Sequence, residues 1–185
     1  MNIVFDMDCT IALFQKKIVE IYNNEYSDNV IDYNSSYWFS QCTKANFQYF
    51  RDVCNRKGIF KDLEPIEGMI DLINELSERH KIIFVTNPVS NHYWKKIEKV
   101  KWLTKYFPNL EYDLCFTGDK YLIDCDIFID DDIKYLNNQK QSGIRICYGD
   151  YGWNKDWKGL RVENAIELEM IINIIENEQK NKRAK

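Results

Sequence analysis

The 185-residue chain has little of what several classes of protein site require. It contains only two histidines, and its six cysteines, at positions 9, 42, 54, 115, 125 and 147, form no Cys-x-x-Cys pair. A zinc site or a thiolate–histidine pair is therefore a poor expectation, and the cysteines are expected to be free thiols in a reducing compartment. No apolar run approaches membrane-spanning length and no signal-peptide pattern opens the sequence, so we expect a cytoplasmic protein without membrane contact.

The chain also lacks the excess of positive charge that a polyanion would attract. It has 25 Lys and Arg against 29 Asp and Glu, for a net charge of −4, which makes a nucleic acid polymer an unlikely partner. The basic residues near the end, in 180–185, are expected to be solvated, and residues 181–185 to be disordered. The oligomeric state is left open, with a homodimer as one option.

What the sequence does contain is an alternation of strand-like and helix-like segments. Apolar runs typical of buried strands cover residues 3–5, 82–85, 112–116, 126–129 and 144–148. Helical spacing of apolar residues covers residues 67–79, 93–106 and 164–177. The helix over 93–106 has Ile97, Val100 and Leu103 as its apolar positions. The alternation predicts an α/β fold, a parallel sheet wrapped by helices with right-handed crossovers.

Residues 14–65 interrupt this alternation. Phe14, Ile18 and either Ile21 or Tyr22 share one helical face, and Phe47, Phe50 and Cys54 share another. We therefore expect a small helical cap over 14–65, inserted after the first strand and lying over the carboxyl edge of the sheet, with residues 1–13 and 66–180 as the catalytic core.

The first strand ends in two carboxylates, Asp6 and Asp8. Carboxylates at i and i+2 suit phosphoryl transfer because one can attack phosphorus while the other donates a proton to the leaving oxygen and later takes one from water. A strand-end turn with an aspartate as a helix cap is the simpler alternative.

Other strand ends carry complementary groups. Thr86 and Asn87 follow the strand at 82–85 and offer a hydroxyl and an amide to phosphoryl oxygens, while Lys120 supplies a fixed cation. Taken alone, either of these polar strand ends is better explained as a simple cap or turn.

Asp130, Asp131 and Asp132 follow the strand at 126–129. Burying this acidic run beside Asp6 requires a compensating cation, and Mg²⁺ is the expected one because it prefers oxygen ligands. Asp132 has an alternative role as the cap of the next helix.

Together these residues resemble the haloacid dehalogenase-like (HAD) superfamily, and more narrowly the 5'(3')-deoxyribonucleotidase group. The resemblance spans nearly the whole chain. The residues on which the resemblance rests are Asp6-Met7-Asp8-Cys9-Thr10, Thr86, Gly58 to Pro65, Lys101 to Pro108, Thr117-Gly118-Asp119-Lys120 and Phe128-Ile129-Asp130-Asp131.

The resemblance implies a Rossmann-like core with helices on both faces, a helical cap, and hydrolysis of nucleoside monophosphates, preferentially deoxy ones, through an aspartyl-phosphate. It also implies that Mg²⁺ is held by the Asp6 carboxylate, the Asp8 backbone carbonyl and the Asp131 carboxylate, with Asp130 adjacent. The residues that match the family's base pocket are Phe14, Tyr37, Trp38 and Phe60. The alternative is that these four form the cap's own core.

The sequence departs from the family pattern at four positions. Cys9 replaces a glycine that follows the second Asp, at a backbone position suited to unusual torsions. Asn87 stands where relatives often have Ser, Gly118 where some have Arg, and Cys54 where some place a pocket Trp. Two alternatives to a nucleotidase therefore stay open: a phosphatase for another small phosphorylated metabolite such as a sugar phosphate, and a non-catalytic nucleotide-binding regulator.

Overall fold

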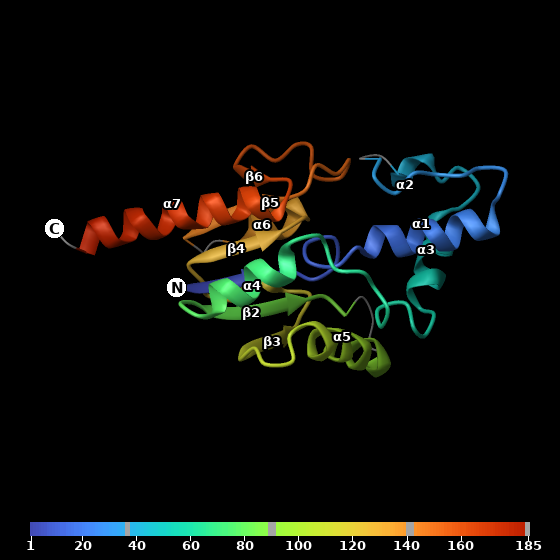
Figure 1. Cartoon of the computed structure of the whole chain (residues 1–185). Coiled ribbons are helices and arrows are strands. Elements are labelled where there is room, and N and C mark those ends of the chain that lie inside the picture. The colour runs from blue at the N-terminus through green and yellow to red at the C-terminus, as the bar shows by residue number, and fades with distance from the viewer. Residues whose placement is uncertain (36–37, 89–91, 140–142, 184–185) are drawn as a thin grey trace.

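A six-stranded parallel sheet forms the centre of the chain, and its strand order is β3-β2-β1-β4-β5-β6 (Figure 1). The computed structural model describes residues 1–35, 38–88, 92–139 and 143–183. The strands are β1 (Asn2–Phe5), β2 (Lys81–Thr86), β3 (Tyr112–Phe116), β4 (Ile127–Asp130), β5 (Ile144–Tyr148) and β6 (Leu160–Val162). Ligands of open α/β sheets bind where this order reverses, which is here the crevice between the carboxyl ends of β1 and β4.

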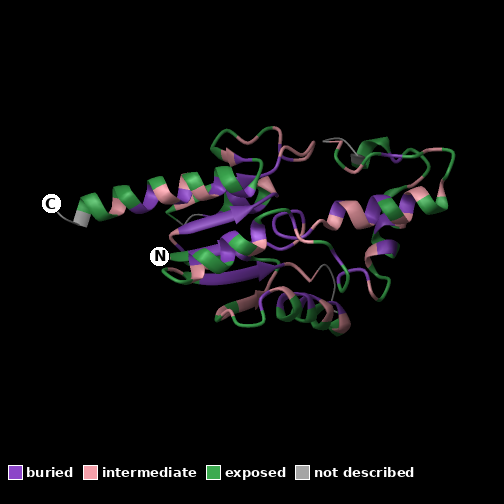
Figure 2. Cartoon of the chain, viewed as in Figure 1, coloured by how far each residue is buried: buried purple, intermediate pink, exposed green. Residues whose placement is uncertain are grey.

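The strands are apolar on both faces because helices cover both faces, as the sequence predicts. Alternate residues such as Phe5 and Ile129 face one core with α4 (Met69–Ser77) and α7 (Ala165–Arg183). Their neighbours, such as Phe128, face a second core with α6 (Ile133–Asn138). Figure 2 shows the central strands β1, β2 and β4 almost wholly buried, whereas β3 is only partly buried and α7 keeps one side exposed.

Three helices follow β1 and lie beyond the end of the sheet toward which the strand arrows point (Figure 1). They are α1 (Phe14–Glu25), α2 (Trp38–Gln41) and α3 (Phe47–Cys54). The predicted apolar face of α1 is buried through Ile18 and Tyr22. For α3 the predicted face is confirmed at Phe50, which is buried, and wrong at Phe47, which is 70% exposed, because Val53 is the residue buried together with Phe50.

The predicted apolar face of α5 (Tyr93–Tyr106) is confirmed at Leu103 but wrong at its other two positions. Ile97 and Val100 are 45% and 40% exposed, and the buried face carries Lys95 and Lys99 together with Trp102 and Leu103. The reason is that this face meets polar acceptors as well as the sheet: Lys95 Nζ donates to Asn55 Oδ1 at 2.8 Å, and Lys99 reaches the carboxyl edge.

The C-terminal part differs from the sequence-based prediction in two respects. The three-residue strand β6 extends the sheet, and α7 continues to Arg183. The expected disordered segment 181–185 therefore begins inside a helix, and residues 184–185 lie outside the described part of the chain. Among the described helices, none is long and apolar enough to cross a membrane.

Candidate active site

Most of the side chains predicted at the strand ends meet in one hollow of about 250 Å³ at the carboxyl edge of the sheet, whereas Thr86 is fully buried and does not line it. Its lining residues come from the ends of β1, β2, β4 and β5 and from α1, α6 and η1 (Lys120–Leu122). They are Asp6, Asp8, Cys9, Phe14, Asn87, Lys120, Asp130, Asp131, Asp132, Tyr135 and Trp153. The hollow lies at the point where the strand order reverses between β1 and β4.

A tight turn after β1 holds the two leading aspartates. Asp6 continues the strand, since its N–H donates to the Ile129 carbonyl at 3.0 Å. The Met7 carbonyl then accepts backbone N–H groups from residues 10–12, and Cys9 adopts a left-handed conformation with φ of 62°. Glycine takes this conformation without steric cost, which explains why glycine suits this position. Cys9 has a Cβ atom and is therefore strained here.

Lys120 joins two of the aspartates. Its Nζ lies 2.5 Å from Asp6 Oδ1 and 2.7 Å from Asp130 Oδ2, and 4.2 Å from the centre of the Tyr135 ring. Burial alone would lower the pKa of Lys120, but the two carboxylates raise it above its usual value. Lys120 is therefore a permanent cation directed at Asp6.

One cation does not neutralise the acidic cluster. Carboxylate oxygens of Asp6, Asp130 and Asp131 all lie within 4.8 Å of one another, and all three residues are buried. Burial raises the pKa of Asp130 to about 7 and, with the charges of Asp130 and Asp6, raises that of Asp131 well above its usual value. Three buried oxygen donors with this much uncompensated charge fit a hard divalent cation. Asp132 instead caps α6 by accepting from Lys134 N–H at 2.8 Å, as the alternative predicts.

Thr86 and Asp8 share a partner that sequence reasoning missed. Lys99 Nζ lies 2.5 Å from Asp8 Oδ2 and 2.6 Å from Thr86 Oγ1. Burial raises the pKa of Asp8, and the Lys99 charge opposes that rise. The signal in the sequence is the spacing of Lys95, Lys99 and Trp102, which places two lysines on the same helical face as a tryptophan.

Trp153 is a second residue that sequence reasoning missed. Its Nε1 donates to Asp131 Oδ2 at 2.9 Å, and its ring stacks on Tyr151 with centroids 4.5 Å apart. The Tyr151 hydroxyl in turn donates to the Cys9 carbonyl at 3.1 Å, which ties this loop to the strained turn. The available signal was its position just after a predicted strand, at the edge where the aspartates lie.

Comparison with known proteins places this geometry in a family. Residues 1–179 match the family described as 5' nucleotidase, deoxy (pyrimidine), cytosolic type C protein. The chain belongs to this family.

One relative and two solved structures are also similar to this chain, and the two structures share its fold. A 5'(3')-deoxyribonucleotidase of Bacillus subtilis (strain 168) is 29% identical over 170 residues, covering 90% of this chain and 95% of that protein. A haloacid dehalogenase-like family hydrolase from Xanthomonas campestris shares the fold with a TM-score of 0.54 at 11% identity, covering 98% of both chains. A putative HAD-hydrolase from Bacillus subtilis, solved bound to magnesium, does so with a TM-score of 0.53 at 15% identity, covering 93% of this chain and 98% of that one.

The aromatic residues that match the family's base pocket are only partly at the hollow. Phe14 lines it and stacks on Phe60, with ring centroids 5.3 Å apart and planes 5° apart. Phe60 is fully buried, so it supports Phe14 and does not reach the hollow. Tyr37 lies outside the described residues, and Trp38 begins α2 with a side chain that is also outside them. Asn87 Nδ2 donates to the Tyr135 hydroxyl at 2.9 Å.

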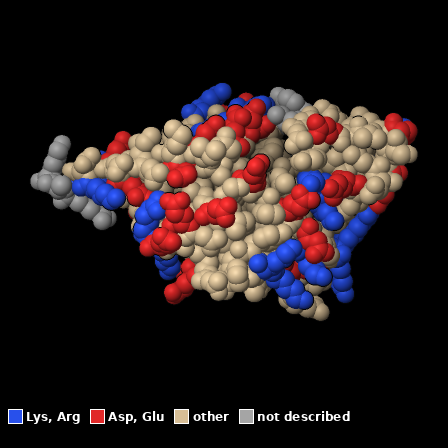
Figure 3. Space-filling model, viewed as in Figure 1, with Lys and Arg blue, Asp and Glu red and all other residues tan. Residues whose placement is uncertain are grey.

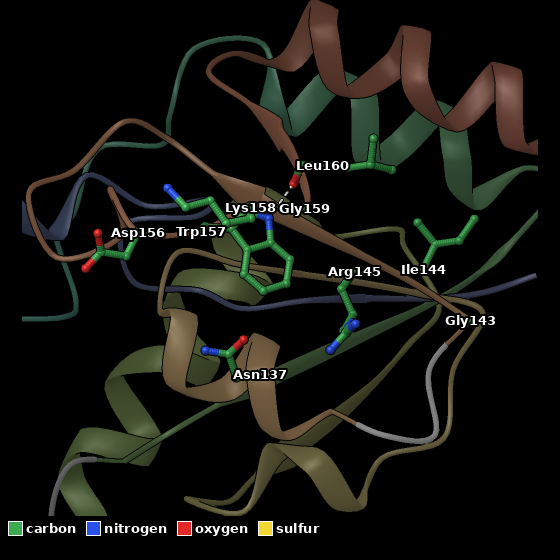
Figure 4. A pocket seen from close by; sticks show the side chains of 9 residues that line it. All are labelled: Asn137, Gly143, Ile144, Arg145, Asp156, Trp157, Lys158, Gly159 and Leu160. Atoms are coloured by element: carbon green, nitrogen blue, oxygen red, sulfur yellow. Dashed lines mark hydrogen bonds between the residues drawn. The ribbon is translucent and has the colours of Figure 1, made fainter.

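A second, larger hollow of about 440 Å³ lies near the opposite ends of β5 and β6 (Figure 4). Trp157 and Arg145 face each other there, with the guanidinium carbon 5.7 Å from the ring centre, and Trp157 Nε1 donates to the Leu160 carbonyl at 2.8 Å. Size alone would favour this hollow, but the smaller one holds three clustered, buried carboxylates together with the buried cation Lys120.

Proposed function

We propose that this chain is a magnesium-dependent phosphomonoesterase, a 5'(3')-deoxyribonucleotidase that hydrolyses nucleoside monophosphates through an aspartyl-phosphate on Asp6. The observation that carries the proposal is the Asp6 carboxylate at the end of β1, held by Lys120 and grouped with Asp130 and Asp131, in a member of a nucleotidase family. Six free thiols and a net charge of −4 support a small-molecule enzyme of the cytoplasm, without a nucleic acid polymer or a membrane as partner. A homodimer remains an option that oligomeric-state measurements would test.

In the first half-reaction an Asp6 oxygen forms a bond to phosphorus and the ester P–O bond breaks. Asp8 gives its proton to the departing ester oxygen, so the nucleoside leaves as an alcohol. Lys120 holds Asp6 by one oxygen, and Thr86 and Asn87 lie at the neighbouring strand end to donate to the phosphoryl oxygens.

In the second half-reaction water attacks the phosphorus of the aspartyl-phosphate. Asp8, now a carboxylate, takes a proton from this water as the bond between phosphorus and the Asp6 oxygen breaks. Inorganic phosphate leaves, and both aspartates return to their starting protonation states.

The residues present fit Mg²⁺. The carboxylates of Asp6 and Asp131 and the backbone carbonyl of Asp8 would hold it, with Asp130 adjacent, and the raised pKa of Asp131 reflects the buried charge that a cation would offset. When bound, Mg²⁺ would neutralise charge on the phosphoryl oxygens and so ease attack by the Asp6 carboxylate.

The helices α1–α3 support a small substrate. We propose that residues 14–65 form a cap over the core of residues 1–13 and 66–180, which would limit the site to small substrates. Within the hollow, Phe14 offers an aromatic ring backed by Phe60, and such a ring favours a base without dictating which one.

A matched panel tests this proposal. Phosphate release would be measured from deoxy- and ribonucleoside 5'- and 3'-monophosphates, a sugar phosphate and p-nitrophenyl phosphate, with Mg²⁺ and with EDTA. We expect Mg²⁺-dependent turnover that is fastest on the deoxynucleotides. Equal turnover of all phosphates would instead indicate a phosphatase for other small metabolites, and binding without turnover a nucleotide-binding regulator.

A further inference from the structure

Lys99 is buried in a helix whose other lysines mostly face water. Basic side chains gather over α5 in Figure 3, and Lys96, Lys101 and Lys105 are exposed. The Lys99 side chain is only 1% exposed. Removing an ammonium from water costs several kcal/mol unless buried acceptors replace its hydration, so the partners of this lysine define its role.

Two of those partners have assigned roles in the proposed reaction. Lys99 Nζ lies 2.5 Å from Asp8 Oδ2, 2.6 Å from Thr86 Oγ1, and 4.6 Å from the centre of the Phe60 ring. The side chain thus links the end of β1 to the end of β2 from beneath the hollow, with the aromatic face of Phe60 supporting the cation.

The bond to Thr86 fixes the direction of its hydroxyl. An ammonium has donors only, so the Thr86 oxygen must accept from Lys99. The hydroxyl proton of Thr86 is then directed away from Lys99 and is available to an acceptor such as a phosphoryl oxygen.

The bond to Asp8 selects one of its two oxygens. Oδ2 is occupied by Lys99, whereas Oδ1 is buried and has no hydrogen-bond partner among the described residues. A buried oxygen without a partner is costly unless a ligand completes it. Oδ1 is therefore the atom placed to exchange a proton with the substrate's ester oxygen.

We propose that Lys99 is the positioning residue of the site: it holds Asp8 so that Oδ1 meets the leaving oxygen, and Thr86 so that its hydroxyl donates to the phosphoryl group. The inference rests on the proposed function and adds a second buried cation to Lys120. Lys120 touches the nucleophile Asp6, and Lys99 touches the proton donor.

The chain supplies a matched control in Lys95. It lies one helical turn before Lys99, is equally buried, and donates to Asn55 Oδ1 at 2.8 Å. Lys95→Met removes an equally buried ammonium from the same helix, but it removes no hydrogen bond to Asp8 or Thr86.

The experiment compares Lys99→Met and Lys95→Met with the unchanged protein on a deoxynucleoside 5'-monophosphate and on p-nitrophenyl phosphate. The nucleoside alkoxide needs a proton to leave and the aryl oxide does not. General acid–base catalysis contributes roughly 10²- to 10⁴-fold, so we expect kcat of Lys99→Met to fall about 100-fold or more on the nucleotide. On the aryl phosphate we expect a fall of about tenfold, from the misdirected Thr86 hydroxyl alone.

The ratio of the two kcat values is the readout that a structural role would not move. We expect it to fall at least about tenfold in Lys99→Met, to stay within about threefold of the unchanged protein in Lys95→Met, and to recover in part in Lys99→Arg. Thermal unfolding would confirm that each variant folds. If Lys99→Met did not fold, Lys99→Gln, which keeps an amide donor, would replace it in the comparison. Equal losses on both substrates, or no loss, would overturn the inference and leave the proposed function standing. An unchanged protein inactive on both substrates would overturn both.

Discussion

Replacing Trp153 with Phe removes a single hydrogen-bond donor from Asp131, the carboxylate proposed to hold Mg²⁺. The lost bond runs from Trp153 Nε1 to Asp131 Oδ2 at 2.9 Å. A hydrogen bond to a charged group contributes about 1.5–3 kcal/mol, which corresponds to a factor of roughly 10 to 150 in an equilibrium constant. Removing a side chain that hydrogen-bonds to a metal ligand typically lowers the metal affinity by about 10- to 100-fold. We therefore expect Trp153→Phe to bind Mg²⁺ about 10- to 100-fold more weakly.

The assay is a Mg²⁺ titration read in two ways, by turnover of a deoxynucleoside monophosphate and by the shift of the thermal unfolding midpoint. Phe keeps an aromatic ring to stack on Tyr151, so kcat at saturating Mg²⁺ should change far less than the Mg²⁺ midpoint. Trp157→Phe is the matched control, because its indole N–H also donates within the segment after β5, to the Leu160 carbonyl (Figure 4). If both variants bind Mg²⁺ as the unchanged protein does, Trp153 does not orient Asp131.

Three further predictions concern the nucleophile, the acidic cluster and the aromatic support. Asp6→Asn should lower turnover of every substrate in the panel by at least about a thousandfold while the thermal midpoint is retained, and residual activity near that of the unchanged protein would refute its role. Burial raises the pKa of Asp130 to about 7, so the folded metal-free protein retains a proton that the unfolded chain releases above about pH 4. Its stability should therefore fall as the pH rises from about 4 to about 7, and Mg²⁺ should raise the thermal midpoint more at pH 7.5 than at pH 5; equal shifts would contradict this. Phe60→Ala removes a fully buried ring beneath Phe14 and should lower the free energy of unfolding by about 3–5 kcal/mol in urea titrations, whereas a loss under about 1 kcal/mol would show that the stack carries little packing energy.

The strands were the most predictable part of the fold, although β3 is only partly buried. The segments at 112–116 and 144–148 coincide with β3 and β5, because apolar runs bounded by polar residues leave little freedom for a strand in a parallel sheet. The helix over 93–106 was also placed correctly, but its inward face was not. Periodicity identifies a buried face by apolar residues, and a face that carries buried lysines does not fit that rule.

Local sequence patterns also explain why some site residues were predicted and others were missed. The strand-end aspartates could be assigned from position alone, since parallel strands deliver their ends to one edge. Lys99 contacts Asp8, which lies 91 positions away in the sequence, and Trp153 contacts Asp131, 22 positions away. The local sequence signals of these two residues do not identify their partners, because both contacts depend on how a helix and a loop pack against the finished sheet.

Cys9 shows how these later elements support the earliest one. A non-glycine residue in the left-handed region costs roughly 1–2 kcal/mol, so the turn that carries Asp6 and Asp8 is not held by its own backbone preferences. The Tyr151 hydroxyl bonds the Cys9 carbonyl at 3.1 Å, and the Tyr151 ring stacks on Trp153, which bonds Asp131. The segment after β5 therefore contacts the strained turn and the proposed metal ligand together. The geometry of the first five-residue motif depends on residues more than 140 positions later, which is why the motif alone is a weak signal and the assembled site is a strong one.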